Sequence, residues 1–237
     1  MIILELKNVC SGYGPAQVLN ELSIKVEQGK IVTIVGPNGA GKTTTLRTIC
    51  GLLKVTSGEI TFDGQNITGM ASDKIVRAGI AHCPEGRQVW PKMTVMENLE
   101  LGAFTRSDQA GIKADIDKMF EIFPIIKPRS NQLAESLSGG EQQALAIARA
   151  LMLRPKMILF DEPSLGLSPI LISATLNLIA DLPAKQGITV LIVEQNVRMA
   201  LKISDWGYVL EKGRVALEGP AKELAKDEHV KTSYLGM

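Results

Sequence analysis

The sequence predicts an α/β fold, a mainly parallel β-sheet flanked by helices, because strand and helix patterns alternate along it. Largely apolar runs at 30–36, 157–162 and 188–194 are typical of strands that are buried on both faces. Residues 95–153 have a mostly helical pattern and interrupt this alternation. The chain has 237 residues, of which 45% are hydrophobic, so it can bury a sizeable core. We therefore expect a single domain over 1–237, with a helical part at about 95–153 inserted into its core.

The amino-terminal elements follow from short periodic patterns. Apolar residues, alternating or continuous, predict strands at 2–9, 22–26, 30–36 and 79–83. Helices are expected over 42–50, ended by Gly51, and near 71–78. The stretch 84–92 holds two prolines and no clear period, so it is predicted to be a loop.

Two hairpins are predicted from turn residues between apolar runs. Asp63 and Gly64 are typical of the turn of a hairpin within 58–67. Lys212 and Gly213 occupy the same place in a second hairpin, within 207–219.

The middle of the chain contains one clear amphipathic face. Its apolar residues recur at helical spacing, at Ile112, Ile116, Met119, Phe120 and Phe123. Packing against the core is the favoured interpretation of this face, and docking of a partner is the alternative. A further helix is expected over 169–182.

Composition excludes several classes of protein. The 26 Lys and Arg residues nearly balance the 25 Asp and Glu residues, which argues against nucleic acid held by bulk charge. No apolar stretch approaches the ~20 residues of a membrane-spanning helix, and the amino end lacks the pattern of a secretion signal. The three cysteines, Cys10, Cys50 and Cys83, form no metal-binding pair and fit a reducing compartment. We expect a cytoplasmic protein.

A glycine-rich segment between a predicted strand and a predicted helix has the pattern of a phosphate-binding loop. GPNGAGKT at 36–43 satisfies G-x-x-x-x-G-K-[ST]. Glycines let backbone N–H groups approach phosphate oxygens, and the helix that follows presents its positive end to them. Lys42 can reach the β and γ phosphates, and the Thr43 hydroxyl is a ligand for Mg²⁺. An ordinary glycine-rich turn with a surface lysine is the alternative. The predicted phosphate-binding residues are Gly36, Pro37, Asn38, Gly39, Ala40, Gly41, Lys42, Thr43 and Thr44.

Two acidic residues end the strand predicted at 157–162. Asp161 is predicted to hold Mg²⁺, and Glu162 to polarise an attacking water as a general base. A strand that ends in two solvated acids is common and is the alternative. The phosphate loop upstream favours phosphate hydrolysis.

A third motif, LSGGEQQ at 137–143, precedes a predicted helix. Ser138 and Glu141 have the spacing of a capping box, so the segment has an ordinary structural explanation. A capped helix end with two glycines also exposes amides to an anion, so both interpretations can hold together.

In the order and spacing of these three motifs the chain resembles the ATP-binding-cassette (ABC) ATPases. The resemblance implies a P-loop NTPase core with a mainly parallel sheet, an antiparallel β subdomain and an α-helical subdomain, with ATP and Mg²⁺ bound. It implies that Tyr13 stacks on adenine and that the loop 164–168 contacts an opposite subunit. In this family the signature serves ATP bound to the partner subunit, which here implicates Ser138, Gly139, Gly140 and Glu141.

The chain departs from most ABC ATPases at three positions. Glu85 replaces a glutamine and could approach Mg²⁺, and Gln195 replaces a histidine that senses the γ-phosphate. Ser168 replaces an aspartate. Together with the strings PEGR, EPSLGLSP and VEQN and a tail ending in SYLG, these departures resemble the smaller ATPase subunit of branched-chain amino acid importers.

That branch implies a set of partners. They are a second ATPase subunit, in a heterodimer or a homodimer, two integral-membrane permease subunits and, indirectly, a substrate-binding protein, with no nucleic acid. The chain would lie on the inner face of the cell membrane. The region 84–103 is the expected permease contact, with Trp90 and Met93 as apolar anchors or, alternatively, as local packing.

Three other functions remain open at the level of sequence. ATPases of urea and short-amide importers share much of the pattern. An exporter or non-transport ABC ATPase is a second alternative, although no fused membrane segment, coiled-coil or zinc insertion, or duplicated cassette is visible. A regulatory protein that binds ATP without turnover is a third, and the intact Glu162 argues against it.

Overall fold

Two β-sheets organise the chain in the computed structural model, which describes residues 1–232 except the side chain of His229. The tail 233–237 contains the SYLG string on which the resemblance to importer subunits partly rests, and it lies outside the described residues. The antiparallel sheet has the order β2-β1-β4-β5, with β1 (Ile2–Tyr13), β2 (Ala16–Glu27), β4 (Val55–Phe62) and β5 (Gln65–Asn66). The larger sheet has the order β10-β9-β3-β8-β7-β6.

The larger sheet is mainly parallel, and the predicted fold class is confirmed. Its strands are β3 (Ile31–Val35), β6 (Ile80–Cys83), β7 (Met157–Asp161), β8 (Thr189–Glu194), β9 (Trp206–Glu211) and β10 (Arg214–Pro220). β6, β7, β8, β3 and β9 pair in parallel, and β10 closes the edge as the antiparallel partner of β9. Both predicted hairpins are present, as β4–β5 and β9–β10.

Both faces of this sheet are covered, which is why its central strands are continuous apolar runs. In β7, Met157 and Leu159 pack with the antiparallel sheet, whereas Ile158 and Phe160 pack with the helices of the opposite face. Helix α1 (Lys42–Ile49) packs on the same face of the larger sheet as the antiparallel sheet. Burial of a side chain as large as Phe160 contributes roughly 2–3 kcal/mol.

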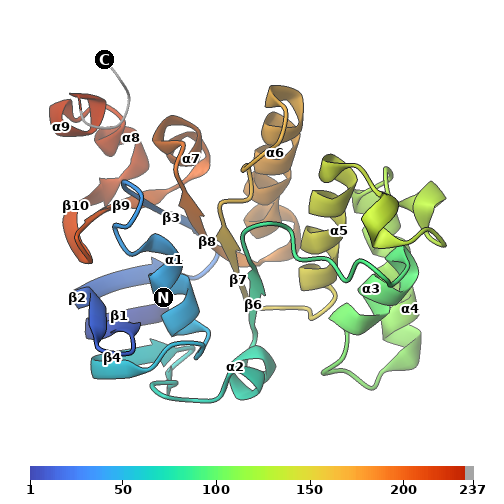
Figure 1. The fold of residues 1–237 in the computed structure, drawn as a ribbon, viewed down its shortest axis with the longest axis horizontal. Coiled ribbons are helices and arrows are strands. Elements are labelled where there is room, and N and C mark those ends of the chain that lie inside the picture. The colour runs from blue at the N-terminus through green and yellow to red at the C-terminus, as the bar shows by residue number, and fades with distance from the viewer. Residues whose placement is uncertain (233–237) are drawn as a thin grey trace.

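The helices of the opposite face gather at the end of the molecule away from the antiparallel sheet (Figure 1). They are α3 (Val95–Gly102), α4 (Gln109–Ile122) and α5 (Gly139–Leu151), with 3-10 turns at Lys127–Arg129 and Ala134–Ser136, and beside them α6 (Pro169–Gln186). The apolar face predicted on α4 is buried at Ile116, Met119, Phe120 and Phe123, so its interpretation as packing is confirmed.

The observed elements differ from the predicted ones in length and in number. β1 and β2 extend beyond the predicted ranges 2–9 and 22–26. The prediction stopped short because bulges shift the register of these strands and break the alternation of their apolar residues. α6 runs through Pro183 to Gln186. Three helices were not predicted, namely α7 (Val197–Ile203), α8 (Ala221–Leu224) and α9 (Glu228–Val230), whereas α2 (Ser72–Ala78) was. No helix in residues 1–232 is long and apolar enough to span a membrane.

Candidate nucleotide site

The phosphate loop connects the end of β3 to the start of α1. Gly41 precedes the helix with a left-handed φ of 106°, and a Cβ there would lie 2.9 Å from Leu19 Cδ2, so the turn requires glycine. Lys42 is the first residue of α1, and its Nζ donates to the carbonyl oxygens of Gly36, at 3.0 Å, and Pro37, at 3.3 Å. The loop therefore curls around its own lysine, with the amino end of α1 directed into the turn.

The acidic end of β7 meets this loop. The Thr43 hydroxyl donates to Asp161 Oδ1 at 3.0 Å, and Lys42 Nζ lies 3.7 Å from Glu162 Oε1. Glu162 has a left-handed φ of 47°, which is uncommon for a residue with a side chain. The two motifs, separated by more than a hundred residues in sequence, thus form one site that contains backbone strain.

Electrostatics at this site are unfavourable for negative charge. Asp161 is 2% exposed, and burial raises the pKa of its carboxyl to about 6. The carboxylates of Glu85 and Glu162 contribute to this raised pKa, while the hydrogen bond from Thr43 opposes it. A cation placed beside Asp161 would relieve this repulsion.

A cavity of about 540 Å³ opens over the phosphate loop. Of the predicted residues, those that line it are Tyr13, Asn38, Gly39, Gly41, Lys42, Thr43, Thr44, Glu85, Glu162 and Gln195. Gly36 and Pro37 act beneath it through their carbonyls, and Ala40 and Asp161 are buried. Val18, which no sequence motif marked, and Leu165, from the loop 164–168, also line the cavity. The Tyr13 hydroxyl accepts a hydrogen bond from Arg47 of α1 at 3.2 Å.

The donor set fits magnesium. The Thr43 hydroxyl and the Asp161 carboxylate are adjacent hard oxygen ligands, which Mg²⁺ prefers. Glu85 lies on the rim of the same cavity. Direct contact of Glu85 with a metal stays a prediction.

The signature segment lies outside this cavity. Its capping box is present: Glu141 accepts from the Ser138 N–H at 2.7 Å, and Ser138 Oγ accepts from the Glu141 N–H at 3.4 Å. Glu141 also accepts from Arg129 at 3.2 Å, and the hydrogen bonds from Ser138 and the nearby Arg129 lower the pKa of this carboxyl against the effect of burial. Ser138 itself is exposed. None of residues 138–141 lines the phosphate cavity.

The two signature glycines have packing roles that the sequence did not reveal. A Cβ at Gly139 would lie 3.0 Å from the guanidinium of Arg87, and one at Gly140 would lie 2.7 Å from Leu171 Cδ1. Arg87 also donates to the Gly166 carbonyl at 3.2 Å. The glycines therefore let the loop after β6, the start of α5 and the loop after β7 approach one another.

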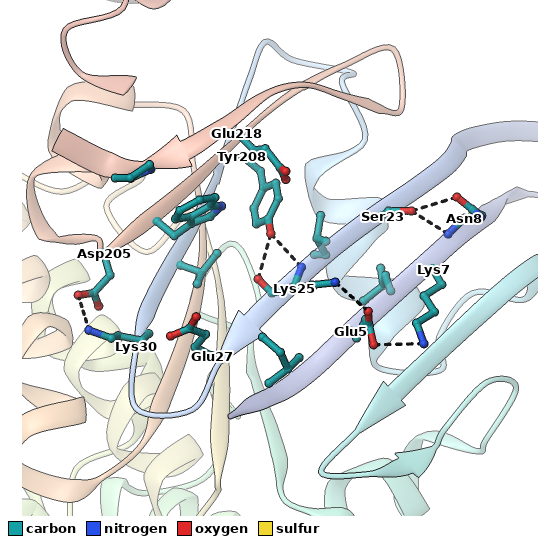
Figure 2. A pocket seen from close by; sticks show the side chains of 16 residues that line it. Glu5, Lys7, Asn8, Ser23, Lys25, Glu27, Lys30, Asp205, Tyr208 and Glu218 are labelled. Atoms are coloured by element: carbon teal, nitrogen blue, oxygen red, sulfur yellow. Dashed lines mark hydrogen bonds and ion pairs between the residues drawn. The ribbon is translucent and has the colours of Figure 1, made fainter. Parts of the chain in front are cut away.

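A larger cavity, of about 760 Å³, lies between the antiparallel sheet and β9–β10 (Figure 2). Lys7 and Lys25 pair with Glu5, and Lys30 pairs with Asp205. The Tyr208 hydroxyl donates to the Lys25 carbonyl at 3.1 Å and accepts from the Lys25 N–H at 2.9 Å. None of the three motifs contributes to this cavity.

A shallower groove of about 340 Å³ lies beside the loop 84–94. Its lining residues are His82, Trp90, Leu101, Gly102, Phe104, Arg149, Ala150 and Leu153. Trp90 and Phe104 are more than half exposed, at 55% and 58%. Buried Asn98 fixes the loop by accepting from the Trp90 N–H and donating to the carbonyls of Trp90, Met93 and Thr94. Trp90 is therefore not part of the core, and its role as a permease anchor or as local packing stays a prediction.

Comparison with known proteins identifies the family. A family model described as ABC transporter matches residues 19–165. This chain belongs to the ABC transporter ATPases. It is an ATP-hydrolysing subunit of a membrane transporter, and ATPases of this family act in pairs together with membrane permease subunits.

Relatives of known transport systems align along nearly the whole chain. BraG of Pseudomonas aeruginosa, a high-affinity branched-chain amino acid transport ATP-binding protein, is 45% identical over 99% of this chain and 100% of its own length. LivF of Archaeoglobus fulgidus, a probable branched-chain amino acid transport ATP-binding protein, is 37% identical over 96% of each. LptB of Haemophilus influenzae, from a lipopolysaccharide export system, is 37% identical over 100% of this chain and 98% of its own.

Solved structures share the fold. MJ1267, an ATP-binding cassette of an ABC transporter, superimposes with a TM-score of 0.87 at 31% identity over 99% of both chains. The dimeric cassette MJ0796 bound to ADP and phosphate superimposes with a TM-score of 0.82 at 26% identity, over 92% of this chain and 99% of that one.

Proposed function

We propose that this chain hydrolyses MgATP over the loop 36–43 to drive import of branched-chain amino acids through partner permeases. The observation that carries the proposal is the meeting of the phosphate loop with the acidic end of β7, where Thr43 contacts Asp161 and Lys42 lies near Glu162. The relatives BraG and LivF support the choice of transported substrate.

Each residue of the cavity has a role that its chemistry allows. Lys42 exchanges its two carbonyl partners for β- and γ-phosphate oxygens. Thr43 and Asp161 would hold Mg²⁺, with Glu85 as a further oxygen ligand, and the ion would neutralise charge on the phosphates. Glu162 accepts a proton from the attacking water.

Two further residues bind the ends of the nucleotide. Gln195 directly follows β8 and lines the same cavity as Glu162. Its side-chain amide is therefore placed to donate to a γ-phosphate oxygen. The ring of Tyr13, 43% exposed beside the phosphate loop, stacks on adenine.

The signature completes the nucleotide site of a second ATPase subunit. Ser138, Gly139, Gly140 and Glu141 form a capped helix end at the surface, outside the cavity of their own chain. Such an end binds an anion that arrives from another molecule. The dimeric cassette MJ0796, bound to ADP and phosphate, supports pairing of this kind.

Mixing two inactive variants tests this division of the site. Lys42→Ala removes the phosphate ligand of its own cavity, and Ser138→Arg blocks the signature offered to the partner. Each variant alone should be inactive. Random pairs of the two should recover about a quarter of wild-type ATPase activity, since half of the pairs are mixed and each has one intact site. No recovery, with mixed pairs detected by size and mass, would contradict a divided site.

The groove beside Trp90 is the proposed permease contact, with Met93 on the same loop. Its exposed Trp90 and Phe104 rings suit the apolar side of a short cytoplasmic helix. In proteoliposomes with the permease subunits, Trp90→Ala should lower ATP-driven leucine uptake about tenfold and change the ATPase activity of the isolated chain less than about twofold. Leu52→Ala, at an exposed apolar residue outside the groove, is the matched control.

The same assay tests the transported substrate. Saturable uptake of leucine, valine and isoleucine is the expected result. Uptake of urea alone would favour the short-amide importers. Extraction of lipopolysaccharide would favour the second candidate, an export function, which the 37% identity with LptB supports.

A further inference from the structure

Glu194, the last residue of β8, is a buried carboxylate to which no sequence motif gives a role. It is 2% exposed, and it accepts two hydrogen bonds from one residue, from the Ser164 N–H at 3.0 Å and from the Ser164 hydroxyl at 2.9 Å. The Asn196 backbone N–H donates to it as well. These donors are neutral, and among the described residues no lysine or arginine forms an ion pair with Glu194. Burial raises the pKa of this carboxyl, and the hydrogen bonds from Ser164 oppose that shift.

The partner of Glu194 lies in the turn that carries the proposed catalytic base. Ser164 follows Glu162 by two residues, with buried Pro163 between them. The Glu162 N–H donates to the Val193 carbonyl at 2.9 Å. Successive residues of β8 therefore anchor the turn at both ends, Val193 before the proline and Glu194 after it.

This anchoring explains how Glu162 keeps its left-handed backbone. A strained residue persists only where its surroundings over-determine its conformation. The hydrogen bonds from Glu162 and Ser164 to β8 supply that constraint. Without the carboxylate of Glu194, the Ser164 N–H and hydroxyl would be buried without their acceptor, and the turn could relax.

Glu194 is also adjacent to the second proposed catalytic group. Gln195 lines the cavity over the phosphate loop and, with Ser164 and Glu194, a neighbouring cavity of about 490 Å³. The hydrogen bonds between Glu194 and Ser164 thus connect the end of β8, which precedes Gln195, to the turn that contains Glu162.

We propose that Glu194 is a positioning residue for ATP hydrolysis, which sets the distance between Glu162 and Gln195 by holding Ser164. It touches neither nucleotide nor water in this role. The inference rests on the proposed role of Glu162. A fold-stabilising function alone would predict loss of stability without a specific effect on turnover.

Three substitutions separate the two explanations. Glu194→Ala removes both acceptors and should lower kcat for ATP about 10- to 100-fold, with KM within about twofold, because a misplaced base costs turnover more than binding. Glu194→Gln should keep kcat within about threefold. Its amide oxygen can accept from the Ser164 N–H while its amide nitrogen donates to the Ser164 hydroxyl. Ser164→Ala loses one of the two hydrogen bonds and should lower kcat about threefold to tenfold.

Thr189→Val is the matched control at the other end of β8. The buried Thr189 hydroxyl accepts from the Gly29 N–H at 3.0 Å, so its loss should lower Tm and leave kcat unchanged. The proposal is overturned if Glu194→Gln is as slow as Glu194→Ala, or if either alanine variant keeps wild-type kcat. Parallel loss of kcat in Thr189→Val would overturn it too. Should Glu194→Ala not fold, Ser164→Ala and Glu194→Gln still decide.

Glu162→Gln, measured beside these variants, distinguishes the inference from its premise. Full activity of Glu162→Gln would remove the proposed base itself. Inactive Glu162→Gln together with fully active Glu194→Ala would reject only the positioning role.

Discussion

The cavity between the two sheets and the cavity over the phosphate loop differ in how their charges are satisfied. In the larger cavity the amines pair with carboxylates at the surface, as Lys25 does with Glu5 and Lys30 with Asp205 (Figure 2). Over the phosphate loop, burial together with the carboxylates of Glu85 and Glu162 raises the pKa of Asp161 to about 6.

This difference teaches that volume is a poor guide to function in this fold. The cavity of about 760 Å³ is a junction between two sheets, held by Tyr208. The cavity of about 540 Å³ combines a left-handed Glu162, a buried lysine and like charges at close quarters. Strain and uncompensated charge of this kind are kept where chemistry requires them.

The largest contrast is expected between carboxylates of the two cavities. Glu162→Gln should lower ATPase kcat by about 10²- to 10³-fold, because a general base is lost while the shape of the side chain is kept. Glu218→Gln, which changes a carboxylate that lines the larger cavity (Figure 2), should leave kcat unchanged. Phosphate release from purified protein with MgATP measures both. A Glu162→Gln variant with wild-type turnover would break the comparison.

A second contrast concerns stability without Mg²⁺ or nucleotide. Asp161 has a folded pKa of about 6, above the ~3.9 of an unfolded chain, so the folded state holds this proton more tightly. The free energy of unfolding therefore falls as pH rises from about 4 to 6, and the full penalty persists above 6. Asp161→Asn cannot ionise, so it should raise the free energy of unfolding at pH 8 by about 1–3 kcal/mol and abolish ATPase activity.

The same substitution at Asp205, in the larger cavity, should have the opposite effect on the free energy of unfolding. Its carboxylate accepts from the Ile31 N–H at 2.9 Å and from Lys30 at 3.2 Å. Asp205→Asn should therefore lower the free energy of unfolding by about 1 kcal/mol. Urea denaturation of both variants between pH 4 and pH 8 decides. Destabilisation by Asp161→Asn at pH 8 would contradict the assigned sign.

The smallest expected effect is that of Tyr208→Phe. It removes the hydroxyl that bonds both backbone groups of Lys25, which should cost about 1 kcal/mol of unfolding free energy. ATP binding and turnover should not change, since this hydroxyl lies outside the phosphate cavity. Thermal unfolding and nucleotide titration together measure the two properties. A weakened affinity for ATP would mean that the junction and the site are coupled.

Local sequence patterns predicted most of the fold, because buried strands and glycine-rich turns have strong local signals. The runs that became β3, β7 and β8 are apolar on both faces, and Gly41 marks a turn that no other residue fits. Bulges concealed the ends of β1 and β2, and α7 was missed although Asn196, which caps its amino end, is a local signal.

The site was predictable to the extent that its chemistry is contiguous in sequence. The phosphate loop and the acids after β7 are local strings, and the structure brings them together. Val18 and Asn98 had no such signal, and the VEQN string contains Glu194 without showing its role, which depends on contact with the distant Ser164. An acid at a strand end, such as Glu194, looks solvent-exposed until the fold shows that it is buried.

The burial of every native thiol has a practical consequence. Cys10, Cys50 and Cys83 are at most 8% exposed, and burial raises the pKa of Cys50 and Cys83 to about 12, so neither carries thiolate at neutral pH. Maleimide dyes and thiol-specific oxidants should therefore react little with the three native cysteines. A cysteine introduced at exposed Asn38 in one copy and at exposed Ser138 in another would test, by cross-linking, the proposed approach of the two segments across a pair of subunits.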